Sequence, residues 1–216
     1  MTKAGKILGI GRGLSRPARK NLRGDAMSST GRSRRSFSAA MAADYLTRIR
    51  SIHHALGIPA SYPAQRHLPV QREARRLVTA ARAADDGKPV RLTPRAAAAW
   101  QRMQAAAAKE GMKLLPISGF RSVARQTTII RKKLAAGQPL AAILQLVAAP
   151  GCSEHHTGRA LDVGSPGHTG LDADFAKTRE FRWLKRHAAK FGFRLSYPRQ
   201  NPHDIAYEPW HWCWQA

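Results

Sequence analysis

The stretch G-C-S-E-H-H-T-G-R-A-L-D-V-G at residues 151–164 is the part of this sequence that most constrains the fold. Residues 159–164 alternate between two faces, as a half-buried β-strand does, with Leu161 and Val163 on one face and Asp162 on the other. We therefore expect Asp162 to point toward a site while the two apolar side chains point toward a core.

Helical patterns precede this stretch. Apolar residues at helical spacing, Ala-rich runs and a Thr93-Pro94 start signal predict helices over residues 42–54, 77–84, 93–111, 122–136 and 140–149. A short apolar run at residues 113–117 predicts a strand that ends shortly before Arg121.

After the stretch, the pattern predicts a helix over residues 175–191 and strands over 193–197 and 205–214, the last interrupted by Pro209. A chain of 216 residues that is 43% hydrophobic is long enough to bury a core in one domain. Together these elements predict an α+β fold, in which a small, mostly antiparallel sheet carries the site and helices flank it.

The composition excludes several classes of protein. With two cysteines and no C-x-x-C pair, the chain is neither a disulfide-stapled scaffold nor a zinc-knuckle protein. The longest apolar run, at residues 140–150, is far shorter than the ~20 residues that cross a bilayer, so we expect no transmembrane segment. The apolar run at residues 7–10 is also too short for a secretion signal, so we expect no export signal.

Positive charge is concentrated near the N-terminus. The chain has 37 Lys plus Arg and 13 Asp plus Glu, a net charge of +24, and ten of the cations lie in residues 1–40. Because a segment rich in Gly, Ser and Arg buries little surface, we expect residues 1–40 to be a disordered basic arm and residues 41–216 to be the folded domain. The arm is either a contact for polyanions or upstream sequence without a role.

Residues that bind metals and transfer protons gather in the first stretch and in Y-E-P-W-H-W at residues 207–212. A catalytic zinc needs three N or O ligands and one open position. His155, Asp162 and His211 supply two imidazoles and a carboxylate, and Glu208 then remains for proton transfer.

The spacing of these residues requires bends in the chain. His155 and Asp162 are seven residues apart and would face opposite ways on a straight strand, so we expect a bend at Gly158, which tolerates a positive φ. His156 competes with His155 for the metal, but neighbouring residues on an extended chain point apart. Only one of them is expected to bind, and the other is expected either to support the site from behind the ligands or to contact the substrate.

Together, S-E-H-x-T-G-x-A-x-D and E-P-W-H-W resemble the motifs of the VanY-type zinc D-alanyl-D-alanine carboxypeptidases, which are related to the D-Ala-D-Ala dipeptidases. Three other segments are similar to that family as well: S-G-F-R-S at residues 118–122, F-R-W-L at 181–184 and F-R-L-S-Y-P at 193–198. The similarity runs from about residue 52 to residue 214 and leaves the basic arm uncovered.

The resemblance implies hydrolysis of the D-Ala-D-Ala terminus of peptidoglycan stem peptides or precursors. It also implies a periplasmic or cell-wall-facing location, whereas the lack of a recognisable export signal leaves a cytoplasmic location open. The resemblance further implies roles for seven residues: zinc ligands His155, Asp162 and His211, catalytic base Glu208, Arg121 as the cation near the reacting carbonyl, and substrate contacts Ser153 and Gln126.

Two rival functions use the same residues. One is an endolysin-like peptidase or a dipeptidase of the same family, and the other is a noncatalytic basic module that binds polyanions or the cell wall. Glu208 separates catalysis from binding, because a structural zinc site is closed and needs no free carboxylate. Cys152 and Cys213 lie near the predicted ligands in the sequence, so a disulfide, two free thiols, or Cys213 as a competing ligand are all open.

Overall fold

The structure is a computed structural model that describes residues 29–215 and the side chains of residues 41–215. The chain divides into two units, residues 1–41 and 42–216. Helix α1 (Ser29–Ala55) contains the helix expected over 42–54 but begins earlier, because no proline interrupts the segment before it. Residues 29–40, expected to be part of a disordered arm, are therefore helical.

Residues 1–28 lie outside the described residues, and with them most of the predicted basic arm. The arm's contact with polyanions and the assignment of residues 41–216 to one catalytic domain stay predictions. Among the helices that the structure describes, none combines the length and the hydropathy needed to cross a bilayer.

The central feature of the second unit is a four-stranded antiparallel sheet. Its strands lie in the order β3 (Leu115–Ser118), β4 (Ala160–Gly164), β6 (His211–Trp214) and β5 (Phe193–Leu195). All five residues of β4 are buried, so this strand is covered on both faces and not half-buried as its alternating pattern predicts. This small antiparallel sheet, together with the helices around it, confirms the predicted α+β fold class.

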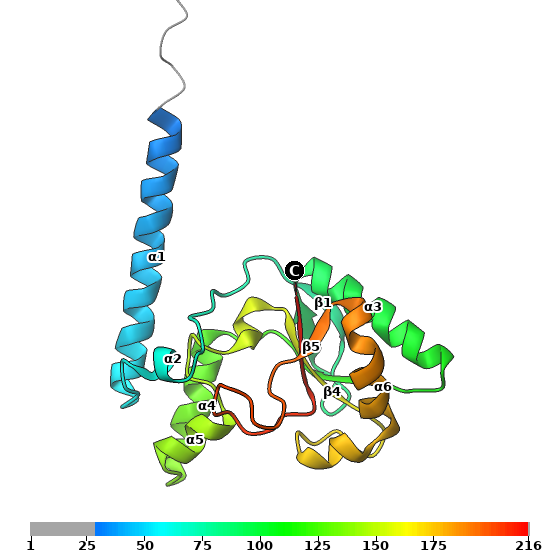
Figure 1. Cartoon of the computed structure of the whole chain (residues 1–216). Coiled ribbons are helices and arrows are strands. Elements are labelled where there is room, and N and C mark those ends of the chain that lie inside the picture. The colour runs from blue at the N-terminus through cyan, green and yellow to red at the C-terminus, as the bar shows by residue number, and fades with distance from the viewer. Residues whose placement is uncertain (1–28, 216) are drawn as a thin grey trace, which may run out of the picture. The chain divides into compact units, whose positions relative to one another are not determined.

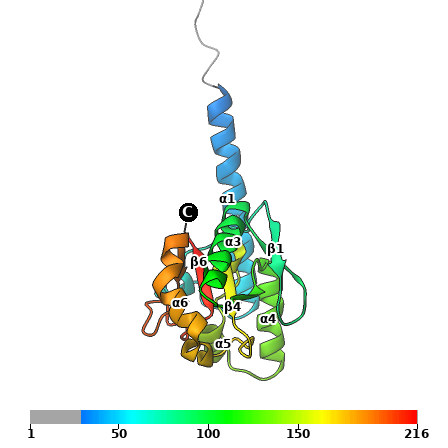
Figure 2. The same cartoon turned by 90° about the vertical axis from the view of Figure 1, so that its right-hand side faces the viewer.

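Helices lie on both sides of this sheet (Figure 1; Figure 2). On one side, α3 (Pro94–Lys109) and α6 (Arg179–His187) pack against the strands and form the larger apolar core, which includes Trp100, Leu161 and Trp212. On the other side lie α4 (Val123–Ala135) and α5 (Leu140–Leu146).

The helices α4 and α5 belong to a second apolar core. This core also takes side chains from the segment after α1 and from short helix α2 (Tyr62–Gln65). Because Asp162 and His211 alternate with the apolar residues of β4 and β6, they point away from the larger core. The polar face of the sheet and the second core are therefore the two walls of the site.

One predicted helix is wrong. Residues 77–84 are not helical but contain β1 (Val78–Arg82), which pairs antiparallel with β2 (Pro89–Leu92). The turn residues Asp-Asp-Gly-Lys at 85–88 connect the two strands, and Gly87 there has a positive φ of 69°. Turn chemistry of this kind outweighs the helix propensity of the alanines before it.

The helix expected over 175–191 is divided into three parts. Short helix η2 (Ala173–Lys177) precedes α6, and η3 (Ala188–Phe191) follows it. Thr178 begins α6 as its N-cap, because its hydroxyl accepts a hydrogen bond from the amide of Phe181 at 3.1 Å. The strand expected over 205–214 is limited to β6, since Pro209 cannot donate to a sheet and residues 205–210 form a loop.

The segment before β1 lies along the loop that carries His155. The amide of Gln71 donates to the carbonyl of Gly151 at 2.6 Å, and the amide of Ala74 donates to the carbonyl of His156 at 2.8 Å. The buried His53 ring donates from Nε2 to the carbonyl of Pro150 at 2.7 Å. These bonds satisfy backbone groups of the loop that no strand reaches.

Candidate metal centre

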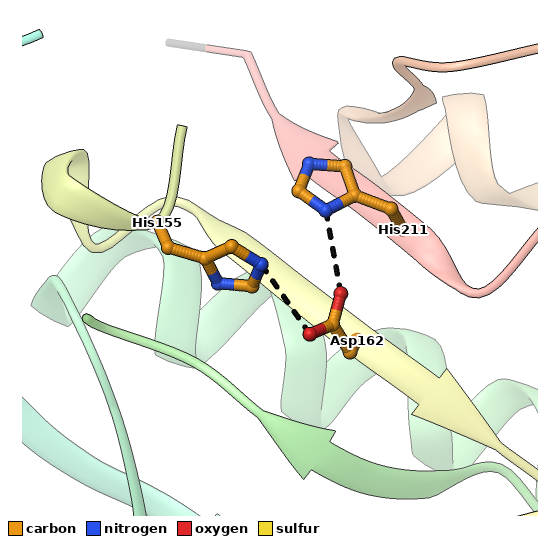
Figure 3. A group of neighbouring side chains, drawn as sticks. All are labelled: His155, Asp162 and His211. Carbon is orange, nitrogen blue, oxygen red and sulfur yellow. Dashed lines mark ion pairs between the residues drawn. The ribbon is translucent and has the colours of Figure 1, made fainter. Parts of the chain in front are cut away.

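The structure brings the three predicted ligands together. His155 lies in the short helix η1 (Glu154–Thr157), Asp162 on β4 and His211 on β6, and their metal-binding atoms all lie within 4.8 Å of one another. Asp162 and His211 are direct partners in the register of β4 and β6. The three side chains point toward one another from these separate elements (Figure 3).

The expected bend between His155 and Asp162 is present. Gly158 ends η1 in the left-handed conformation, with φ 62°, so that the chain turns from η1 into β4. The place is also crowded, because a Cβ on Gly158 would lie 2.7 Å from Cδ2 of Leu77. The positive φ therefore favours glycine at this position, and a larger residue would also require the Leu77 side chain to shift.

Hydrogen bonds on the outer side of each imidazole fix which nitrogen faces the centre. His155 Nδ1 lies 2.6 Å from the carbonyl oxygen of Gly119, and His211 Nε2 lies 3.0 Å from a carboxylate oxygen of Glu154. Both partners only accept, so these nitrogens carry the protons. His155 Nε2 and His211 Nδ1 then face Asp162, each at 3.3 Å from one of its oxygens, and these are the nitrogens available to a metal ion.

This arrangement calls for positive charge at its middle. Asp162 Oδ1 is buried and makes no hydrogen bond with any described residue. Burial opposes charge on all three groups. The two imidazoles nevertheless hold the pKa of Asp162 well below its usual range. Asp162 and Glu154 likewise raise the pKa of His211 to about 10. Two nitrogens and one carboxylate oxygen are the donor set of a catalytic zinc site, so the residues fit that ion.

Glu208 lies beside this centre without being a member of it. Its Oε2 is 3.7 Å from His211 Nδ1, and its backbone is fixed by a bond from its amide to the carbonyl of Tyr197 at 3.1 Å. Burial raises the pKa of the Glu208 carboxyl to about 7, although His211 and Arg121 act to lower it. A carboxyl group of this kind is suited to accept and return a proton.

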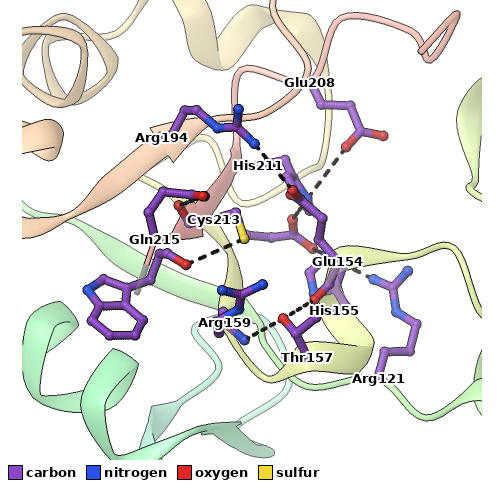
Figure 4. Close-up of polar contacts among 12 residues, drawn as sticks. Arg121, Glu154, His155, Thr157, Arg159, Arg194, Glu208, His211, Cys213 and Gln215 are labelled. Atoms are coloured by element: carbon purple, nitrogen blue, oxygen red, sulfur yellow. Dashed lines mark hydrogen bonds and ion pairs between the residues drawn. The ribbon is translucent and has the colours of Figure 1, made fainter. Parts of the chain in front are cut away.

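Arg121 follows β3, and its guanidinium group points toward the centre, as the Glu208 carboxyl does (Figure 4). Its Nη2 lies 3.7 Å from Asp162 Oδ2, and its Nη1 donates to Gln126 Oε1 at 3.2 Å. Gln126 in turn donates from Nε2 to the carbonyl of Ala148 at 2.7 Å. Both ends of the Gln126 amide are thus used within the chain, and Gln126 orients Arg121.

A cavity of about 340 Å³ opens onto the metal centre. Glu208, Arg121, Gln126 and Ser153 all line it, together with the three predicted ligands. A volume of this size is in the range of small-molecule sites. A molecule bound in this cavity would lie next to the Glu208 carboxyl and the Arg121 guanidinium.

Comparison with known proteins agrees with this geometry. The model of a family described as "VanY: D-alanyl-D-alanine carboxypeptidase" matches residues 89–216, which is more than half of the chain. This chain belongs to the VanY family.

The relatives of this VanY-family chain include YodJ of Bacillus subtilis (strain 168), which is 40% identical over 121 residues. That match covers 54% of this chain and 43% of YodJ, so the chain spans less than half the length of that relative.

Two solved structures share the fold. The LdcB LD-carboxypeptidase, whose structure concerns peptidoglycan recognition, has a TM-score of 0.61 and 33% identity, covering 68% of this chain and 71% of that one. A mutant of the vancomycin resistance D,D-pentapeptidase VanY from a VanB-type resistance cassette, in complex with Zn(II), has a TM-score of 0.52 and 27% identity, covering 68% and 82%.

Glu154 is a residue of this VanY-family site for which sequence reasoning gave no role. It orients His211 and lies 3.7 Å from the partly exposed Arg194 (Figure 4). Burial opposes its charge, but His211 and Arg194 lower the pKa of the Glu154 carboxyl to about 2. The available signal was an acidic residue directly before a predicted ligand, since metal-bound histidines commonly donate to a carboxylate.

His156 does not join His155 at the centre. Its ring is fully buried, where Nε2 accepts from the amide of Gly151 at 3.0 Å and Nδ1 donates to the carbonyl of Arg121 at 2.5 Å. His156 therefore connects the loop before η1 to the segment that carries Arg121. This is the supporting position expected for whichever histidine does not bind.

Both cysteines are free and buried. Cys152 belongs to the second apolar core, and burial raises the pKa of its thiol to about 12. Cys213 lies on β6 opposite Ala160, outside the group of metal-capable residues. Of the three alternatives for these residues, the structure has two free thiols.

Proposed function

We propose that this chain is a zinc-dependent carboxypeptidase that removes the terminal D-alanine from peptidoglycan stem peptides ending in D-Ala-D-Ala. The observation that carries the proposal is the buried convergence of His155, Asp162 and His211, with Glu208 left free beside them. The zinc complex of a VanY-family relative supports the choice of metal. The family's description supports the choice of substrate.

In this proposal His155, Asp162 and His211 hold the zinc ion. When bound, zinc supplies Lewis-acid chemistry, which lowers the pKa of water to about 7 and stabilises negative charge on a carbonyl oxygen. The hydrogen bonds that the Gly119 carbonyl and the Glu154 carboxylate accept hold both imidazoles in the tautomer that this role requires.

Glu208 and Arg121, which both line the cavity, supply proton transfer and charge stabilisation. Glu208 takes a proton from the attacking water and later gives it to the departing amine of D-alanine. Arg121, held by Gln126, presents a planar cation to the oxygen on which negative charge develops or to the terminal carboxylate of the peptide. Ser153 lines the same cavity and is placed to contact the bound peptide.

The similarity to LdcB favours a second candidate within the same chemistry. An L,D-carboxypeptidase removes a single D-alanine that follows an L-residue, and it needs the same metal, base and cation. The two candidates differ in the stereochemistry of the residue before the cleaved bond. Stem peptides that end in D-Ala-D-Ala and peptides that end in one D-Ala therefore distinguish them.

The experiment compares Glu208→Gln with the wild-type protein on both peptides, with D-alanine release followed by mass spectrometry and zinc content measured on each protein. We expect Glu208→Gln to retain zinc and to lose at least 100-fold in turnover, as removal of a general base does. Glu110→Gln, an exposed carboxylate at the end of α3, is the matched control. Unchanged turnover in Glu208→Gln would remove the proposed base, and a wild-type protein that binds zinc but cleaves neither peptide would favour the binding module.

A further inference from the structure

Helix α4 forms one wall of the cavity along its length. Gln126 and Lys133 both line the cavity and are seven residues apart, so they lie on one face of the helix, two turns and about 10 Å apart. Gln126 is at the inner end, where it contacts Arg121 beside the metal centre. Lys133 therefore marks the end of this wall that is farther from the centre.

Lys133 is the charged lining residue that the metal centre does not use. The other charged lining residues, Arg121, Asp162 and Glu208, contact one another or a predicted ligand. Lys133 is half-buried and forms no ion pair with an acid in the described part of the chain. Its Nζ has a neutral neighbour, Gln138 Oε1, at 3.5 Å.

Two apolar side chains that are exposed also line the cavity. Leu146 at the end of α5 is 54% exposed and Leu171 is 44% exposed, although both line the cavity. Exposed leucines in a concave site are covered when a ligand binds. A ligand that suits this cavity therefore has aliphatic groups as well as a negative charge.

We propose that Lys133 binds a carboxylate of the substrate on the N-terminal side of the cleaved bond, and so selects acidic stem peptides. This inference rests on the proposed function. An extended peptide covers about 10 Å in three residues. A carboxypeptidase substrate has only one residue on the C-terminal side of the cleaved bond, so a group at that distance lies on the N-terminal side. The group that reaches Lys133 then belongs to the second or third residue before the bond.

Stem peptides offer carboxylates at both of these positions. The D-glutamate, linked through its side chain, keeps a free α-carboxylate, and meso-diaminopimelate in the next position has a carboxylate that L-lysine lacks. Both residues also have methylene groups that fit against Leu146 and Leu171. Amidation removes the charge of either carboxylate with almost no change of shape, which makes the charge itself testable.

The test measures kcat/KM for D-alanine release from three N-acetylated pentapeptides. The reference contains D-isoglutamine and L-lysine, the second contains D-glutamate in place of D-isoglutamine, and the third contains meso-diaminopimelate in place of L-lysine. We expect wild-type protein to cleave at least one acidic peptide about tenfold faster than the reference, and Lys133→Gln to lose that preference while cleaving the reference unchanged. Lys132→Gln, the exposed neighbour on α4, is the matched control.

Two results would overturn the inference: equal cleavage of all three peptides by wild-type protein, or a preference that survives in Lys133→Gln. A loss of the preference in Lys132→Gln as well would assign it to the general charge of the helix and also overturn the inference. A wild-type protein that cleaves none of the peptides, including one that ends in a single D-Ala, refutes the proposed function instead.

Discussion

His211 Nε2 lies 3.0 Å from Glu154 Oε2. Glu154 comes directly before the predicted ligand His155, and it fixes the ring of a second predicted ligand, His211, which is 57 positions further along the chain. Glu154 is also in an ion pair with Arg194, which is partly exposed on β5. Two ligand-bearing segments are thus joined by a bond that does not involve the metal. The orientation of His211 is set before any ion arrives.

Glu154→Ala is expected to lower the affinity for zinc by 10- to 100-fold, because His211 loses the acceptor that holds its proton on Nε2. Glu154→Gln keeps an acceptor oxygen but not its charge, so its loss should be smaller. Competition with a chromophoric chelator measures both affinities. This role would be contradicted if Glu154→Ala bound zinc as tightly as Glu110→Gln, the control at an exposed site.

His156→Phe is expected to destabilise the protein by about 2 kcal/mol or more. The substitution leaves the amide of Gly151 and the carbonyl of Arg121 buried without their partner, and each unsatisfied group costs about 1–3 kcal/mol. Urea unfolding followed by tryptophan fluorescence gives the free energy. His54→Phe, at an exposed position, is the control and should change it by less than about 0.5 kcal/mol.

Gly158→Ala and Gly87→Ala form a second matched pair. Both glycines have positive φ, 62° and 69°, so each substitution costs about 1 kcal/mol in backbone strain. A Cβ on Gly87 meets nothing within 4 Å, whereas a Cβ on Gly158 is crowded by Leu77. Gly158→Ala should therefore be the more destabilising in urea unfolding and should also weaken zinc binding, while Gly87→Ala leaves zinc binding unchanged.

Both thiols are expected to resist alkylation in the folded protein. Burial raises the pKa of Cys152 to about 12 and that of Cys213 further, so neither is a thiolate between pH 7 and pH 9. Mass spectrometry after iodoacetamide treatment should find no label on native protein and two labels after unfolding in denaturant. Fewer than two labels on the unfolded, unreduced protein would mean that a disulfide had formed.

The parts of the site that depend on local sequence were predictable. The bend at Gly158 and the direction of Asp162 follow from residue types and from the alternation of a strand. The N-cap at Thr93 with Pro94 after it gave the start of α3 correctly.

Features that depend on tertiary contacts were not predictable. The bond between Glu154 and His211 requires η1 to lie against β6, and no local pattern states this. Burial of both faces of β4 depends in the same way on which helices cover the sheet. In residues 77–84, the helix propensity of alanine concealed a strand that exists because β2 is there to pair with it.

The backbone bonds from Gln71 to Gly151 and from Ala74 to His156 have a consequence for the limits of the autonomous folding unit. The family match begins at residue 89, after both donors. Excision at that boundary would remove both donors and leave the carbonyls of Gly151 and His156, in the loop that presents His155, without these partners. We therefore expect a piece that keeps these bonds, and the bond from His53 to Pro150, to start upstream of residue 89, at or before the helix that contains His53.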